Sequence, residues 1–68
     1  MASDVGKIAQ AAKRVMDARQ LVFDQKTRVV RLRAVGMDSG DAERILPVLE
    51  ANLEVFKGHL EKLRSGKA

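Results

Sequence analysis

Side chains that could do acid–base or nucleophilic chemistry are few in this sequence and lie far apart. His59 is the only histidine, cysteine is absent, and no serine or paired acid stands at a spacing that would complete a catalytic triad. Zinc prefers Cys and His ligands, so one histidine makes a metal site improbable. The glycines, at positions 6, 36, 40, 58 and 66, fit no phosphate-binding loop. We therefore expect no enzyme, no cofactor and no metal.

Positive charge offers a second kind of chemistry, the binding of phosphates. The formal net charge is +4, and residues 1–35 hold eight basic and three acidic side chains. Asp17 and Asp24 interrupt the basic side chains, and an aromatic content of 3% leaves no surface on which bases could stack. Nucleic-acid binding is therefore an alternative to an ordinary solvated helix face. Its candidate contacts are Lys13, Arg14, Arg28 and Arg31.

These side chains must be positioned by helices that meet at one internal break. Gly36 suits the left-handed position just past a helix, and Asp38 suits the N-cap of the next helix. The sequence therefore predicts one domain over residues 1–68, with helices over 4–35 and 39–64, a turn over 36–38 and a frayed tail over 65–68. Pro47 lacks a backbone N–H, so we expect a kink near residues 43–46 or a restart of the helix there.

Apolar residues recur at intervals of three or four along both predicted helices, which is typical of coiled coils and helical bundles. We call these two rows the seam. The short turn makes the helices antiparallel, so the fold class is an all-α, coiled-coil-like two-helix hairpin. The first seam row is Ile8, Ala11, Val15, Ala18, Val22, Gln25, Val29 and Leu32, and the second is Ala42, Leu46, Leu49, Leu53, Phe56, Leu60 and Leu63.

Folding at the turn also predicts polar contacts between the helices. Along one flank, Arg33 falls near Glu43 and Lys26 falls near Glu50, so opposite charges face each other. Gln25 is the one polar residue in the first seam row. A buried amide in such a core commonly fixes the register or the oligomeric state, which is the role we expect for Gln25.

A second apolar row on the first helix is not explained by one hairpin. Ala9, Met16, Phe23 and Val30 recur every seven residues, about 100° around the helix from the seam. One neighbouring helix cannot cover both rows, and a short chain without disulfides commonly gains stability by self-association. We therefore predict a homodimer that forms a four-helix bundle. The predicted subunit or partner contacts are Met16, Phe23, Val30, Val48 and Val55.

The chain shows no sign of a membrane location. No apolar run approaches the roughly 20 residues of a membrane span, and the first residues lack the features of a secretory signal. The apolar residues are assigned to helix contacts, so binding to a membrane surface is not expected either. The predicted location is the cytoplasm.

The region from residue 22 to residue 63 carries a loose pattern of apolar residues, a Gly-x-Asp turn and a late histidine. Its members are Val22, Gln25, Val29, Leu32, Gly36, Asp38, Ala42, Ile45, Leu46, Leu49, Leu53, Phe56, His59 and Leu60. This pattern resembles short, mostly uncharacterised helical-hairpin proteins of α-proteobacteria such as the rhizobia. Pro47 and the long basic start depart from it. The resemblance implies a bacterial origin and a hairpin fold, and it supplies no catalytic residues.

Two functions follow as expectations. The first is a small non-enzymatic adaptor or regulator that acts through self-association and by binding another macromolecule, with a protein as a compatible partner. The alternative is a nucleic-acid-binding bundle that uses the basic first helix. In architecture alone, it would resemble the plasmid copy-number protein Rop, a dimeric hairpin bundle that holds RNA.

Overall fold

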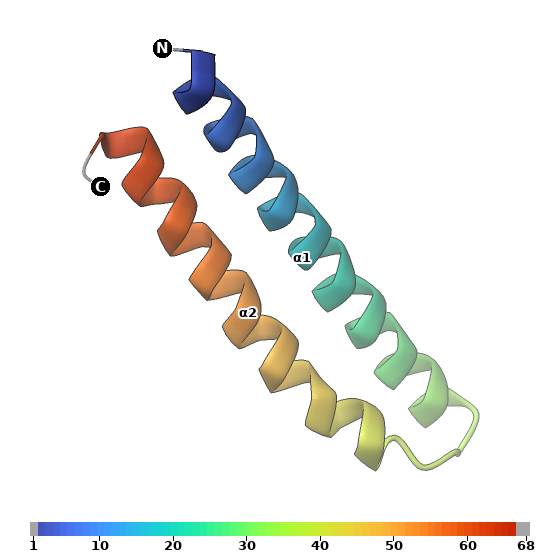
Figure 1. The fold of residues 1–68 in the computed structure, drawn as a ribbon. Helices are drawn as coiled ribbons and strands as arrows, with labels where there is room; N and C mark the ends of the chain where they lie inside the picture. The colour runs from blue at the N-terminus through green and yellow to red at the C-terminus, as the bar shows by residue number, and fades with distance from the viewer. Residues whose placement is uncertain (1, 67–68) are drawn as a thin grey trace.

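The chain folds as two long antiparallel α-helices joined by a short turn (Figure 1). A computed structural model describes the backbone of residues 2–66 and the side chains of residues 5–66. Helix α1 spans Ala2–Ala34 and helix α2 spans Gly40–Ser65, so the helices begin and end within two residues of the predicted bounds. The prediction of an all-α helical hairpin is confirmed. Of the predicted tail, Ser65 still belongs to α2, and residues 67–68 lie outside the described part.

Gly36 ends α1 in the way the sequence predicts. Its φ angle is 74°, a left-handed conformation that side-chain-bearing residues rarely adopt. The Gly36 N–H donates to the Arg33 carbonyl at 3.1 Å, and the Met37 N–H donates to the Leu32 carbonyl at 2.8 Å. This pair of bonds is the Schellman motif, which satisfies carbonyls that the end of the helix would otherwise leave free.

The start of α2 differs by one residue from the prediction. Ser39, not Asp38, occupies the N-cap position, and its side chain makes no capping hydrogen bond. The Asp38 carboxylate nevertheless accepts the Gly40 N–H at 2.9 Å. Asp38, one residue before the N-cap, therefore satisfies one of the N–H groups that the start of α2 leaves free. The Ser39 hydroxyl donates instead to the Glu43 carboxylate at 2.5 Å.

The core is a thin layer of small side chains. Five seam residues of α1 are buried, whereas on α2 only Ala42 is buried among the apolar residues. The larger seam residues of α2, five leucines and Phe56, are all half-buried. A lone hairpin therefore leaves much of its largest apolar side chains in water. The buried α1 residues are Ala11, Val15, Ala18, Val22 and Val29.

Helix α2 continues through Pro47 as one helix, which excludes a restart at that point. Because proline has no N–H, the Glu43 carbonyl loses its usual helical donor. In the adjacent position, the Gln25 side-chain amide donates to the Ala42 carbonyl at 2.8 Å across the hairpin. Gln25 therefore links the two helices next to the irregular turn of α2. The predicted kink near residues 43–46 stays a prediction.

Candidate helix-docking surfaces

The line along which α1 and α2 meet has two sides, one on each face of the hairpin. Because the helices are antiparallel, residues that directly follow a seam residue turn toward one face on both helices, and residues that directly precede one turn toward the other. Lys26 and Arg33 on α1, and Glu43 and Glu50 on α2, all follow seam residues. The two faces are therefore lined by different positions of the sequence.

The first face is spanned by ion pairs between the helices, and we call this side of the helix junction the bridged groove. The Arg33 guanidinium pairs with the Glu43 carboxylate, and the Lys26 ammonium lies 3.9 Å from the Glu50 carboxylate. Both predicted ion pairs are confirmed. Their side chains are 42–63% exposed, so each pair is worth about 0.2–1 kcal/mol and selects the register more than it stabilises the fold.

The second face has hollows lined by both apolar and polar side chains, and we call its groove the open groove. Three hollows follow one another along it, and each is lined by residues from both halves of the hairpin. The middle hollow, of about 150 Å³, lies between Leu21 of α1 and Leu49 and Phe56 of α2. Among residues 5–66, no ion pair crosses this face. The larger apolar residues that line the open groove are Leu21, Leu32, Met37, Ile45, Leu49, Phe56 and Leu63.

Leu21 and Ile45 are members of this groove that sequence reasoning missed. Both precede a seam residue, and they are 54% and 50% exposed. The row of every seventh residue through Leu21 is otherwise basic at Arg14 and Arg28, so its single leucine gave no periodic signal. A comparison of the two helices in register would have identified Leu21 and Ile45, because both precede a seam residue and therefore lie on the same face.

Met16, Phe23 and Val30 lie on the bridged-groove face, because each directly follows a seam residue. We call them the outer stripe. They are 68%, 64% and 66% exposed, which shows that α2 does not cover this second row of α1. Their role as an oligomer or partner contact stays a prediction, but their surface is available for one.

Val48 and Val55 lie on the opposite face from the outer stripe. They are 59% and 67% exposed, and both directly precede a seam residue, so they flank the open groove. The five predicted contact residues therefore form two separate sets. No single flat partner surface can contact both sets, because they point away from each other across the hairpin.

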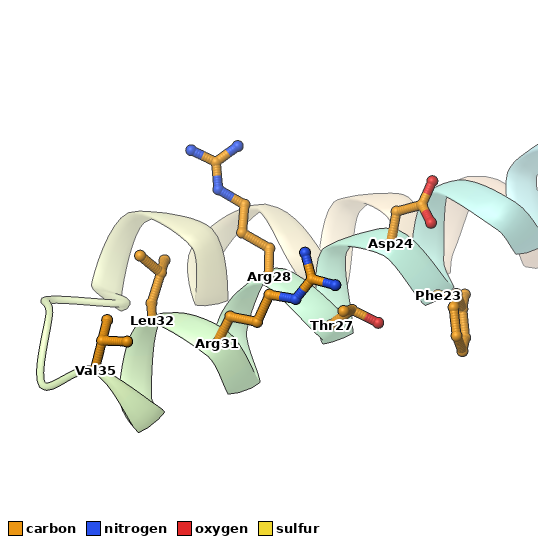
Figure 2. Close-up of a pocket in the computed structure, with 7 residues that line it drawn as sticks. All are labelled: Phe23, Asp24, Thr27, Arg28, Arg31, Leu32 and Val35. Atoms are coloured by element: carbon orange, nitrogen blue, oxygen red, sulfur yellow. The ribbon is translucent and has the colours of Figure 1, made fainter.

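The four basic side chains predicted to contact nucleic acid do not form one cluster. Lys13 pairs with Asp17 at 2.8 Å on its own helix, and Arg14 lines the open groove. Figure 2 shows Arg28 and Arg31 beside a shallow depression lined by residues 23–35 alone, with Arg28 directed away from Phe23. At 1.5 Å per residue, Arg14 and Arg28 are about 21 Å apart along α1. Phosphates would meet separate cations on this helix rather than one patch.

The part of the chain that the structure describes contains no group of three or more His, Cys, Asp or Glu side chains that could hold a metal ion. His59 is exposed and lines the end hollow of the open groove beside Leu63. Neither described helix is long and apolar enough to cross a membrane.

No family model, curated protein or solved structure matches this sequence significantly. The resemblance to α-proteobacterial hairpin proteins therefore stays a prediction that rests on the residues quoted for it.

Proposed function

We propose that this protein is a homodimeric helical docking module. Two copies pack open groove against open groove to form a four-helix bundle, and the bundle presents its remaining helix surfaces to another macromolecule. The observation that carries this proposal is the open groove itself, where half-buried side chains such as Leu49 and Phe56 from α2 stand beside exposed Leu21 from α1.

The surface area of the chain supports a second copy as the occupant. The hairpin is a thin rod with Cα extents of 54 × 15 × 12 Å, and it exposes 5471 Å². A folded monomer of 7.5 kDa typically exposes only about 4,200 Å². A dimer with the surface usual for its mass would bury about 3,900 Å² in total, within the range of permanent homodimers.

The open groove suits this contact better than the bridged groove does. A partner on the bridged groove would have to remove water from Lys26, Glu50, Arg33 and Glu43, a cost that ion pairs seldom recover. The open groove also has charged side chains in its lining, such as Arg14 and Arg28, but no ion pair of the described residues crosses it. It offers apolar side chains from both helices, which is what the core of a four-helix bundle requires. Nucleic-acid binding has weaker support, because the four predicted cationic contacts are dispersed over α1.

Sedimentation equilibrium of Ile45→Glu tests the proposal. We expect the wild-type chain to have the mass of a dimer at micromolar concentration, and Ile45→Glu to shift it to a monomer. Met16→Glu is the matched control, since it places the same charge on an exposed apolar position of the opposite face and should leave the dimer intact. A monomeric wild type, or a dimer broken by Met16→Glu and not by Ile45→Glu, would reject the open groove as the subunit contact.

Circular dichroism on the same samples guards against misreading an unfolded variant. If Ile45→Glu loses helix content on dilution while Met16→Glu keeps it, folding and association are coupled at the open groove, as proposed. If both variants lose helix content equally, the effect is not specific to that face and the proposal fails.

A further inference from the structure

Basic side chains from both helices line the hollow at one end of the open groove. This hollow has a volume of about 290 Å³, and Lys7 and Arg14 of α1 line it together with His59 of α2. We call it the terminal hollow, because it lies at the end of the hairpin where α1 begins and α2 ends (Figure 1). Gln10 also lines it. The packing of α2 against α1 therefore adds an imidazole to two cations and an amide that one face of α1 presents.

These polar side chains share one face because of their places in the sequence. Lys7, Gln10 and Arg14 each directly precede a seam residue, and intervals of three and four residues make them neighbours on the surface of α1. His59 directly precedes a seam residue of α2, so it lies on the same face of the hairpin. Lys62 does so too and adds a further positive charge to this end of the face.

Little negative charge offsets these cations. No acidic side chain of the described residues lines the terminal hollow. Arg14 also lines the middle hollow, where the carboxylate of Asp17 pairs with Lys13 at 2.8 Å. Gln10, Arg14 and His59 take part in none of the ion pairs or side-chain hydrogen bonds that the described residues form. The terminal hollow therefore presents donors and positive charge to a ligand.

We propose that the terminal hollow binds the phosphate group of a small phosphate monoester. The Lys7 ammonium and the Arg14 guanidinium would face the phosphate oxygens, and a guanidinium can donate to two of them at once. The Gln10 amide and a ring N–H of His59 would donate to the oxygens that remain. One hairpin supplies all four groups, so this inference does not rest on the proposed dimer.

The remaining lining favours a phosphate that carries a small organic group. Ala11 and Leu63 are the apolar residues of the terminal hollow, and its volume of about 290 Å³ leaves room for such a group beside the phosphate. A nucleic-acid strand laid along the open groove would instead continue past Asp17 and Asp41, whose carboxylates repel phosphates. A single small anion avoids both carboxylates.

An NMR titration of the full chain with phenyl phosphate tests this inference. His59 is the only histidine of the chain, so its ring signals report on the terminal hollow without ambiguity. At constant pH and ionic strength, we expect these signals to shift and saturate with a dissociation constant of about 1 mM, because exposed charges attract weakly through water. Inorganic phosphate should bind more weakly, and phenol, which has the ring without the phosphate, should not bind.

Two arginine variants separate a site from general attraction of an anion to a basic chain. Arg14→Gln removes a lining guanidinium and should weaken phenyl phosphate binding by about fivefold or more. Arg64→Gln is the matched control, because Arg64 lies at the same end of the hairpin but directly follows a seam residue and so belongs to the other face. It should leave the dissociation constant within about twofold. Circular dichroism should show unchanged helix content in both variants.

Several results would overturn the inference. Shifts that do not saturate, or a loss of binding that is equal in Arg14→Gln and Arg64→Gln, would mean that there is no site at the terminal hollow. Inorganic phosphate that binds as tightly as phenyl phosphate would remove the organic group from the proposal. Capture of the chain by phosphatidic acid vesicles without binding of phenyl phosphate would assign the phosphate to a lipid headgroup instead of a small molecule.

The same titration on Ile45→Glu keeps this result separate from the proposed dimer. Saturable binding to a monomeric Ile45→Glu chain would support the terminal hollow even if the open groove is not a subunit contact. A wild-type dimer, together with an Ile45→Glu monomer, neither of which binds phenyl phosphate, would remove only the inference about the ligand.

Discussion

The bridged groove and the open groove are made by the same two helices, yet they differ in what lines them. On the bridged side, residues that follow the seam include side chains of opposite charge, and Lys26–Glu50 and Arg33–Glu43 span the two helices. On the open side, residues that precede the seam include Leu21 and Ile45, and hollows lined by both apolar and polar side chains lie where no ion pair crosses. One face of the hairpin is closed by its own chain, and the other is not.

The two faces therefore contribute differently to the fold, one to the register of the helices and the other to hydrophobic stabilisation. The charged pairs are exposed and contribute little free energy, so their main effect is to fix which residues face each other. The half-buried side chains of the open groove hold the larger reserve of hydrophobic free energy, because each apolar Å² removed from water is worth about 25 cal/mol. The register is therefore set within one chain, whereas the proposed dimer would add the stabilisation that comes from covering the open groove.

The largest effect is expected at the seam, which both grooves share. Val22 is 8% exposed, so Val22→Asp would bury an unpaired carboxylate and should cost about 3–5 kcal/mol of unfolding free energy. Thermal melts followed by circular dichroism measure this loss. Phe23→Asp is the control at the next residue, where 64% exposure should keep the chain folded. If both variants melt alike, the seam is not where the structure places it.

A smaller effect is expected at Gln25, whose amide hydrogen-bonds to the Ala42 carbonyl across the hairpin. Gln25→Ala should lower the unfolding free energy by about 1 kcal/mol, because the hydrogen bond to the Ala42 carbonyl across the hairpin is lost. Gln20→Ala serves as the control, since Gln20 bonds only to Asp24 of its own helix and is exposed. Urea melts that show equal midpoints for the two variants would contradict the role given to Gln25 in linking the helices.

The smallest effect is expected at the bridged groove and depends on pH. The Ser39 hydroxyl and the Arg33 guanidinium, in that order of importance, hold the pKa of the Glu43 carboxyl below its ordinary value of 4.5. A lowered pKa stabilises the fold above the unfolded-state pKa, and this contribution disappears as the pH falls through the lower, folded-state value.

We therefore expect the wild type to melt slightly above Glu43→Gln at neutral pH, and the gap to close in acid below pH 4.5. A gap between wild type and Glu43→Gln that widens in acid would have the wrong sign for a lowered pKa.

Periodicity and turn chemistry predicted most of the hairpin because both are local. Gly36 ends α1 through a left-handed residue, and the two ion pairs follow once the turn fixes the register. Ser39 replaced Asp38 as the N-cap because several polar residues in a row can each serve, and only the backbone geometry selects one.

The candidate surfaces were less predictable because they depend on both helices together. The outer stripe was found on α1 alone, and Val48 and Val55 were found on α2 alone. Two such sets share a face only if both follow, or both precede, the seam residues of their own helix, because the helices are antiparallel. The spacing of apolar residues along each helix separately does not show this. Leu21 was missed for the same reason, since its neighbours every seven residues are basic.

The mass of the wild-type chain in solution tests the central claim most directly. Sedimentation equilibrium over a dilution series should give about twice 7.5 kDa at the higher concentrations, with helix content and mass falling together as the dimer dissociates. A particle of 7.5 kDa that keeps its helix content and melts cooperatively at every concentration would contradict it. In that case the open groove would be a stable free surface of a single hairpin.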